Sequence, residues 1–190
     1  MGIISIEKDK DGIKGLHIIT PCRYGDSRGW FMETYNQKDL SAEGIEIVFV
    51  QDNQSLSSKG VLRGMHFQKE HPQAKLIRVT RGEVFDVVVD LRENSGTYGK
   101  WHGEILSAEN ARQILVPKGF AHGFLTLSDY AEFSYKCDDF YHPEDEGGFI
   151  WNDPSVGIEW PVVTGEKGEL CMEDGTEIIL SEKDRNLRRL

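Results

Sequence analysis

The feature that most constrains the fold is a succession of short β-forming runs separated by turn signals, with no long 3.6-residue pattern. The run at residues 84–91 shows the strand period best. One face of it carries Phe85, Val87, Val89 and Leu91, and the other carries Val84, Asp86, Val88 and Asp90. Strands are predicted at residues 16–20, 29–35, 47–53, 60–68, 75–81, 84–91, 101–107, 113–117, 123–127 and 131–137. Short strands with glycine-rich turns indicate a mainly β fold, an antiparallel jelly roll or barrel with a few short helices.

A chain of 190 residues is expected to form a single domain, residues 1–190. A short helix is predicted at residues 37–44. The tail differs from the rest, because residues 162–180 are polar and contain Asp174-Gly175, a hairpin turn signal. We therefore expect a hairpin insert at 162–180, followed by a short helix capped by Ser181.

The net charge of −10 argues against nucleic acid and membrane surfaces as partners, since both require a basic face. No apolar run approaches the roughly 18 residues that a membrane span needs, and the first residues lack the apolar stretch of a secretory signal. The three cysteines, Cys22, Cys137 and Cys171, are widely spaced and form no CxxC pair. This usage favours a reducing compartment, so the expected location is the cytoplasm.

His66 is the first candidate for chemistry, although a lone histidine in an apolar strand is more often structural. A metal site through a His-x-His pair is not favoured, because Gln68 stands where the second histidine is needed. Without a metal, a histidine acts as a general acid or base and needs a partner. Tyr135 is a candidate acid, although taken alone its position favours a core tyrosine with a satisfied hydroxyl.

Basic residues gather around the same region of an acidic chain, namely Arg28, Arg63, Lys75, Arg78 and Arg81. They fit either a solvated strand face or a diphosphate clamp with a cation for a developing oxyanion. Arg63 and His66 have opposite parity on a regular strand. A shared cavity therefore requires a bulge, for which Gly64 is the natural site.

A family resemblance adds to this interpretation. The motifs that carry it are DSRGWFMETY, FVQDNQS, GVLRGMHFQ, HPQAKLIRVTRGEVFDVVVDLR, PKGFAHGF, AEFSYKCDDFYHPEDEGG and WNDPSVGIEWP, and it resumes at LSEKD. Together they make the chain resemble the dTDP-4-dehydrorhamnose 3,5-epimerases, small cupin-fold enzymes that act on deoxysugar nucleotides. The resemblance implies a dTDP-4-keto-6-deoxy sugar as substrate, a homodimer with an exchanged N-terminal strand, and neither cofactor nor metal.

The resemblance also implies a role for individual residues. His66 would remove the protons next to the C4 ketone, and Asp184 would orient His66. Tyr135 would return the proton from the opposite face, and Lys75 would stabilise the enolate oxygen. The remaining implied residues bind substrate: Arg28, Glu33, Gln51 and Asn53 along the nucleotide-sugar site, Arg63 and His122 at the diphosphate and sugar, and Tyr141 and Glu146 at the thymidine end.

Three alternatives stay open from the sequence. A relative that inverts only C3 or only C5 would share the same base, acid and barrel. A metal-dependent cupin oxygenase or isomerase, and a non-catalytic nucleotide-sugar-binding cupin, belong to different classes. The insert at 162–180 separates Asp184 from the rest of the pattern, so the His66–Asp184 pairing depends on how that insert packs.

Overall fold

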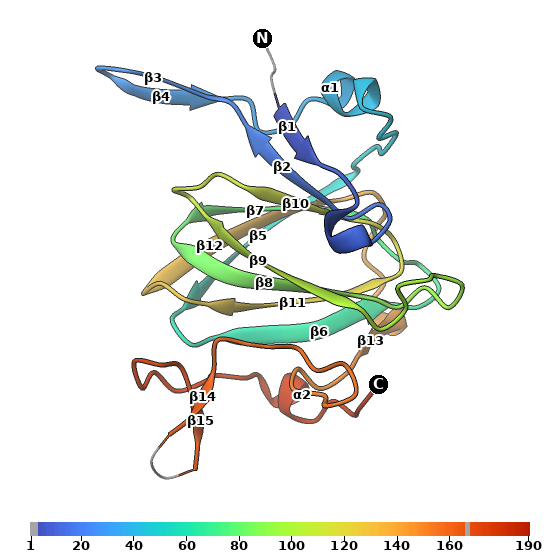
Figure 1. Cartoon of the computed structure of the whole chain (residues 1–190), viewed down its shortest axis with the longest axis vertical. Helices are drawn as coiled ribbons and strands as arrows, with labels where there is room; N and C mark the ends of the chain where they lie inside the picture. The colour runs from blue at the N-terminus through green and yellow to red at the C-terminus, as the bar shows by residue number, and fades with distance from the viewer. Residues whose placement is uncertain (1–3, 166–167) are drawn as a thin grey trace.

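The computed structural model describes residues 4–165 and 168–190. These residues form two large antiparallel sheets (Figure 1). The six-stranded sheet has the order β1 (Ile4–Glu7), β2 (His17–Pro21), β10 (Gln113–Val116), β7 (Lys75–Arg81), β12 (Tyr130–Cys137) and β5 (Gln51–Ser58). The five-stranded sheet has the order β13 (Glu146–Gly148), β6 (Leu62–Gln68), β11 (Phe120–Thr126), β8 (Glu83–Asp90) and β9 (Trp101–Ser107). This arrangement confirms the predicted mainly β jelly roll.

The two sheets enclose the main hydrophobic core. Ile77 and Phe133 come from the six-stranded sheet, and Val88 and Phe124 come from the five-stranded sheet. The rings of Phe124 and Phe133 stack with centroids 4.2 Å apart, which joins the sheets face to face.

A second core covers the outer face of the five-stranded sheet. Val87 and Val89 pack there against Phe149, Trp151 and Trp160 of the C-terminal region. Both faces of β8 are therefore buried, and this explains why valines occupy both parities of the run at 84–91.

Several strand boundaries differ from those predicted. The strand expected at 47–53 starts at Gln51 and continues to Ser58 as β5, an edge strand of the six-stranded sheet. Its sequence, QDNQSLSS, is polar because every second side chain is exposed and only Ser57 is buried, so it carries no apolar alternation. The strand expected at 29–35 is the shorter β4 (Gly29–Met32), which pairs with the unpredicted β3 (Arg23–Asp26). The unpredicted β1 and β13 are also short.

The tail lies against β6 on the side away from the six-stranded sheet (Figure 1). Residues 162–180 contain a hairpin of β14 (Val163–Thr164) and β15 (Leu170–Cys171). A turn at Asp174-Gly175 follows, closed by the Met172 N–H donating to the Thr176 carbonyl at 2.9 Å. Ile179 then forms a parallel bridge with Val61, which aligns the segment with the start of β6.

Two short helices complete the described chain. Helix α1 (Gln37–Ala42) lies within the predicted helix 37–44 and is capped by Asn36. Helix α2 (Glu182–Arg185) follows Ser181, whose hydroxyl accepts the Asp184 N–H at 3.0 Å, as the predicted cap requires. Neither has the length and apolar character that crossing a membrane demands. The three cysteines are free.

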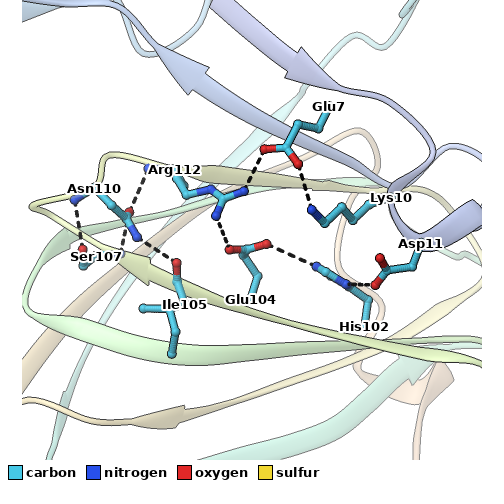
Figure 2. A network of polar contacts seen from close by, with 9 residues as sticks. All are labelled: Glu7, Lys10, Asp11, His102, Glu104, Ile105, Ser107, Asn110 and Arg112. Atoms are coloured by element: carbon cyan, nitrogen blue, oxygen red, sulfur yellow. Dashed lines mark hydrogen bonds and ion pairs between the residues drawn. The ribbon is translucent and has the colours of Figure 1, made fainter.

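A polar network joins the N-terminal segment to β9 (Figure 2). His102 Nδ1 lies 2.6 Å from Asp11 Oδ2, and its Nε2 lies 3.3 Å from Glu104 Oε2. Arg112 bridges Glu104 at 2.7 Å and Glu7 at 2.9 Å. Burial lowers the pKa of His102, but its bonds to Glu104 and Asp11 outweigh burial and raise that pKa above its ordinary value.

Candidate active site

A cavity of about 490 Å³ opens between the sheets and the C-terminal segment. It gathers side chains that lie far apart in the sequence: Arg63 and His66 from β6, His122 from β11, Lys75 from β7, Tyr135 from β12 and Asp184 from α2. The residues with implied chemical roles therefore share one cavity, together with two of the implied binding residues.

His66 is held by Asp184. His66 Nε2 lies 2.5 Å from Asp184 Oδ1, and the Asp184 side chain is only 4% exposed. The Ser181 hydroxyl donates to the other oxygen, Oδ2, at 2.8 Å. An ionised carboxylate only accepts hydrogen bonds, so Nε2 carries the ring proton and Nδ1 keeps its lone pair. The insert at 162–180 thus brings Asp184 to the histidine.

Burial sets the protonation state of this histidine. Burial lowers the pKa of His66 below its ordinary value, and the Asp184 carboxylate offsets only part of that shift. His66 is therefore neutral at pH 7 and can accept a proton.

A bulge in β6 allows Arg63 and His66 to reach the same cavity. His66 pairs with His122, but Arg63 pairs with Phe124, so the register shifts by one residue between them. Gly64 has a φ of +122°, and an added Cβ would lie 2.6 Å from the Gly123 Cα. Only glycine fits between these two strands at this position.

Lys75 and Tyr135 come from the six-stranded sheet, on the opposite wall from His66. The Lys75 ammonium lies 5.8 Å from the centroid of the Tyr135 ring. Burial lowers the pKa of Lys75 and raises the pKa of Tyr135. The phenol therefore keeps its proton at pH 7, as a general acid must.

A second histidine–aspartate pair adjoins the first. His122 Nε2 lies 2.8 Å from Asp86 Oδ2, and Asp86 is completely buried. Neither Asp86 nor Lys183, which also lines the cavity, was predicted from the sequence to have a role. The available signal for Asp86 was a carboxylate between valines on one face of a strand.

Gln51, Asn53, Tyr141 and Glu146 do not line the cavity itself but form a connected cluster with Lys183, which does. The Gln51 side chain donates to Asn53 at 3.0 Å and accepts the Tyr141 N–H at 3.1 Å. The Tyr141 hydroxyl donates to Glu146 at 2.7 Å, and this bond raises the pKa of Tyr141 to about 12. Glu146 pairs with Lys183 at 2.5 Å, which connects the cluster to the cavity.

Arg28 and Glu33 lie elsewhere. They belong to the β3–β4 hairpin and its exit, which projects from the body of the molecule (Figure 1). Arg28 pairs with Asp26 at 2.6 Å, and Glu33 accepts a hydrogen bond from Asn36 at 2.6 Å. Within one chain, the structure does not bring these two residues to the cavity.

The residues that the structure describes include no group of three or more His, Cys, Asp or Glu side chains placed to hold a metal ion. The cavity contains a neutral His66 and a protonated Tyr135, with cationic side chains around them.

Comparisons with known proteins agree on one family. Residues 10–190 match a family model described as dTDP-4-dehydrorhamnose 3,5-epimerase. The chain is 52% identical over 181 residues to the dTDP-4-dehydrorhamnose 3,5-epimerase of Methanothermobacter thermautotrophicus, covering 95% of this chain and 92% of that protein.

Solved structures agree with that match. The chain superposes with a TM-score of 0.87 on the Legionella pneumophila dTDP-6-deoxy-D-glucose-3,5-epimerase in complex with dTDP-4-keto-L-rhamnose, at 47% identity over 98% of this chain and 93% of that one. The Bacillus anthracis dTDP-4-dehydrorhamnose 3,5-epimerase, with TDP and PPi bound, gives a TM-score of 0.87 at 43% identity over 99% and 100%. Fold and site thus define a cupin-type carbohydrate epimerase, an isomerase. The chain belongs to the dTDP-4-dehydrorhamnose 3,5-epimerase family.

Proposed function

We propose that this protein epimerises C3 and C5 of dTDP-4-dehydro-6-deoxy-D-glucose to give dTDP-4-dehydro-L-rhamnose. The observation that carries the proposal is the placement of a neutral histidine and a protonated tyrosine on opposite walls of one cavity. Inversion of a carbon centre requires removal of a proton from one face and delivery to the other. These two walls supply both groups.

The chemistry follows from the ketone at C4. The protons on C3 and C5 are both acidic, because each carbanion is delocalised onto the C4 oxygen as an enolate. His66 Nδ1 removes the proton, and Asp184 stabilises the imidazolium that forms. Lys75 stabilises the enolate oxygen. Tyr135 then delivers its proton to the opposite face of the same carbon, which inverts the centre.

The enzyme must then reset its protonation states. After one inversion His66 holds an extra proton and Tyr135 has lost one, so exchange with solvent restores both groups. The same base and acid can then act on the second carbon. The mechanism uses side chains of this chain throughout.

Substrate binding is assigned to the cationic rim of the cavity and the cluster beside it. Arg63 and Lys183 line the cavity and supply positive charge for the diphosphate in a protein of net charge −10. His122 faces the sugar, and the half-exposed ring of Tyr141, fixed by Glu146, offers a stacking surface for the thymine base. Gln51 and Asn53 hold this rim in place.

The proposed assembly is a homodimer. On the β3–β4 hairpin, Trp30 is 58% exposed and Phe31 is 65% exposed. Neighbouring exposed side chains that are large and apolar indicate a surface that contacts another protein. In a symmetric dimer this hairpin would carry Arg28 and Glu33 to the cavity of the partner subunit. This arrangement accounts for two implied binding residues that lie away from the cavity of their own chain.

The test is proton exchange during turnover in deuterated water. We expect deuterium at both C3 and C5 of the 4-keto sugar, observed by NMR, together with formation of the L-rhamno product. Deuterium at only one carbon would identify a single-centre epimerase. Tight dTDP binding without exchange on the 4-keto substrate would instead favour a binding module and overturn the proposal.

A further inference from the structure

Asp86 is a buried carboxylate with an incomplete set of partners. It lies on β8, 0% exposed, between Val84 and Val88 of the main core. Its Oδ2 accepts from His122 Nε2 at 2.8 Å. No described group donates a hydrogen bond to its Oδ1. A charged group in the core without a full set of partners is costly to bury, so a compensating role is expected.

The surroundings of Asp86 point to the active site. Its partner His122 lines the cavity, and the Lys75 ammonium lines the cavity from the opposite sheet. Burial lowers the pKa of Lys75, and the negative charge of Asp86 is among the influences that oppose this change. Asp86 thus acts on one cavity residue through a hydrogen bond and on another through its charge.

Several other groups also face Lys75. The titratable and charged side chains around it are Cys137 and Tyr135 from β12, Asp86 from β8, Glu146 from β13, and His66 and Arg63 from β6. Burial raises the pKa of Cys137 to about 11 and also raises that of Tyr135, so both are neutral at pH 7. Glu146 is already paired with Lys183 at 2.5 Å and with Tyr141 at 2.7 Å. Asp86 is therefore the carboxylate whose charge is least compensated by other partners.

We propose that Asp86 is a positioning residue for the epimerisation, which fixes the ring of His122 and supplies the counter-charge of the Lys75 ammonium. The inference rests on the proposed function. His122 donates its Nε2–H to Asp86 and presents Nδ1 to the sugar. Lys75 stays charged in a dry cavity, where an uncompensated ammonium would lose its proton and with it the ability to stabilise an enolate.

The test compares Asp86→Asn with Asp90→Asn. Both residues are completely buried carboxylates on the same face of β8, but Asp90 bonds Arg92, Ser95 and Thr97, none of which lines the cavity. Asp86→Asn should lower kcat by roughly 10- to 100-fold with little change in KM, less than the about 10²–10³ typical of losing an oxyanion donor outright. If Lys75 loses its proton more easily without the Asp86 charge, the alkaline limb of the kcat–pH profile should move to lower pH by roughly one unit. Asp90→Asn should leave that limb unchanged.

The outcomes separate this inference from the proposed function. If the unaltered protein exchanges no deuterium into the 4-keto sugar, the proposed function fails. If it exchanges normally and Asp86→Asn retains both its kcat and its alkaline limb, only the role of Asp86 fails.

Nitrogen-15 NMR of the unaltered protein gives a second measurement that does not depend on the folding of a variant. A His122 ring that carries its proton at Nε2, the nitrogen facing Asp86, supports the proposal. A ring protonated at Nδ1 alone would overturn it.

Discussion

His66 and His122 stand directly opposite each other on the neighbouring strands β6 and β11. Each ring is held through Nε2 by a carboxylate that is almost or completely buried, Asp184 at 2.5 Å and Asp86 at 2.8 Å. Cross-strand neighbours of this kind place two imidazoles side by side in one cavity. Because each Nε2 is bonded to a carboxylate, Nδ1 is the nitrogen of each ring that lies outside these two pairs.

Replacing His66 by Asn should remove the base while keeping a polar side chain of similar width. We expect the deuterium exchange rate at C3 and C5 to fall by roughly 10³-fold, since general base catalysis typically contributes about 10²–10⁴-fold. Binding of dTDP, measured by calorimetry, should change little. Normal exchange in this variant would exclude His66 as the base.

Asp184→Asn should reduce kcat by roughly 10²-fold or more, because the imidazolium loses its counter-charge. The unaltered enzyme should lose kcat/KM on the acid side only below the ordinary histidine value, because burial lowers the pKa of His66. Since Asp184 raises the pKa of His66, the removal of its charge should move the acid limb to still lower pH.

Ser181→Ala is the matched milder change, because it removes only the hydroxyl donor and the helix cap. It should lower the free energy of unfolding by about 1 kcal/mol. An acid limb that stays fixed in Asp184→Asn would show that it belongs to another group.

Gly64→Ala should disrupt the bulge in β6. The new Cβ would lie 2.6 Å from the Gly123 Cα and 2.9 Å from the His122 carbonyl oxygen, both backbone atoms, at a φ of +122°. We expect a loss of stability of about 2 kcal/mol or more, by analogy with other strained backbone sites, and a larger loss of exchange activity. Gly96→Ala, where nothing lies within 4 Å of the new Cβ, is the control and should behave like the unaltered protein in urea unfolding.

His102 should make the stability of the N-terminal attachment depend on pH. Its bonds to Glu104 and Asp11 raise its pKa above 6.5 against the opposing effect of burial. The stabilisation that protonated His102 provides is therefore fully present below pH 6.5. It is lost as the pH rises through the raised pKa of His102 in the folded protein. His102→Gln should lower the free energy of unfolding at pH 6 by about 1.5–3 kcal/mol, and by less at pH 9.

His17→Gln is the control for that measurement, because burial lowers the pKa of His17. The stability that depends on His17 therefore changes with pH in the opposite direction: it is highest at high pH, where His17 is neutral, and falls as the pH falls. Urea unfolding of the two variants at pH 6 and pH 9 should therefore give opposite trends. Parallel trends would contradict the assignment of the network in Figure 2.

Mixing two inactive variants should test whether the β3–β4 hairpin serves the partner subunit. If Arg28 completes the neighbouring cavity, a dimer of one Arg28→Ala subunit and one His66→Asn subunit contains one intact site. Subunit exchange should then restore roughly a quarter of the normal activity, since half of the dimers are mixed and each has one intact site. An absence of rescue, with mixed dimers verified by mass spectrometry, would place Arg28 in its own subunit's site or outside any site.

The mainly β content and the candidate side chains of the site could both be predicted from the sequence. Residues 84–89 are apolar except for Asp86, as expected of a strand that is covered on both faces, and a pattern of this kind depends only on local side-chain chemistry. The edge strand β5 was misplaced, because its exposed side chains carry no apolar alternation and its hydrogen bonds come from β12. The residues of β5 alone do not indicate that this segment pairs with β12.

The sequence by itself determined that this chain would fold into antiparallel sheets and would contain a histidine base, a phenol and a group of cations. Only the tertiary structure decided that they meet. The bulge at Gly64 turns Arg63 and His66 to one side, and the bridge between Val61 and Ile179 brings α2 alongside β6, so that Asp184 reaches His66. The physical reason is that strand parity is a local property, whereas a one-residue register shift and a contact across 118 positions arise from packing between distant segments.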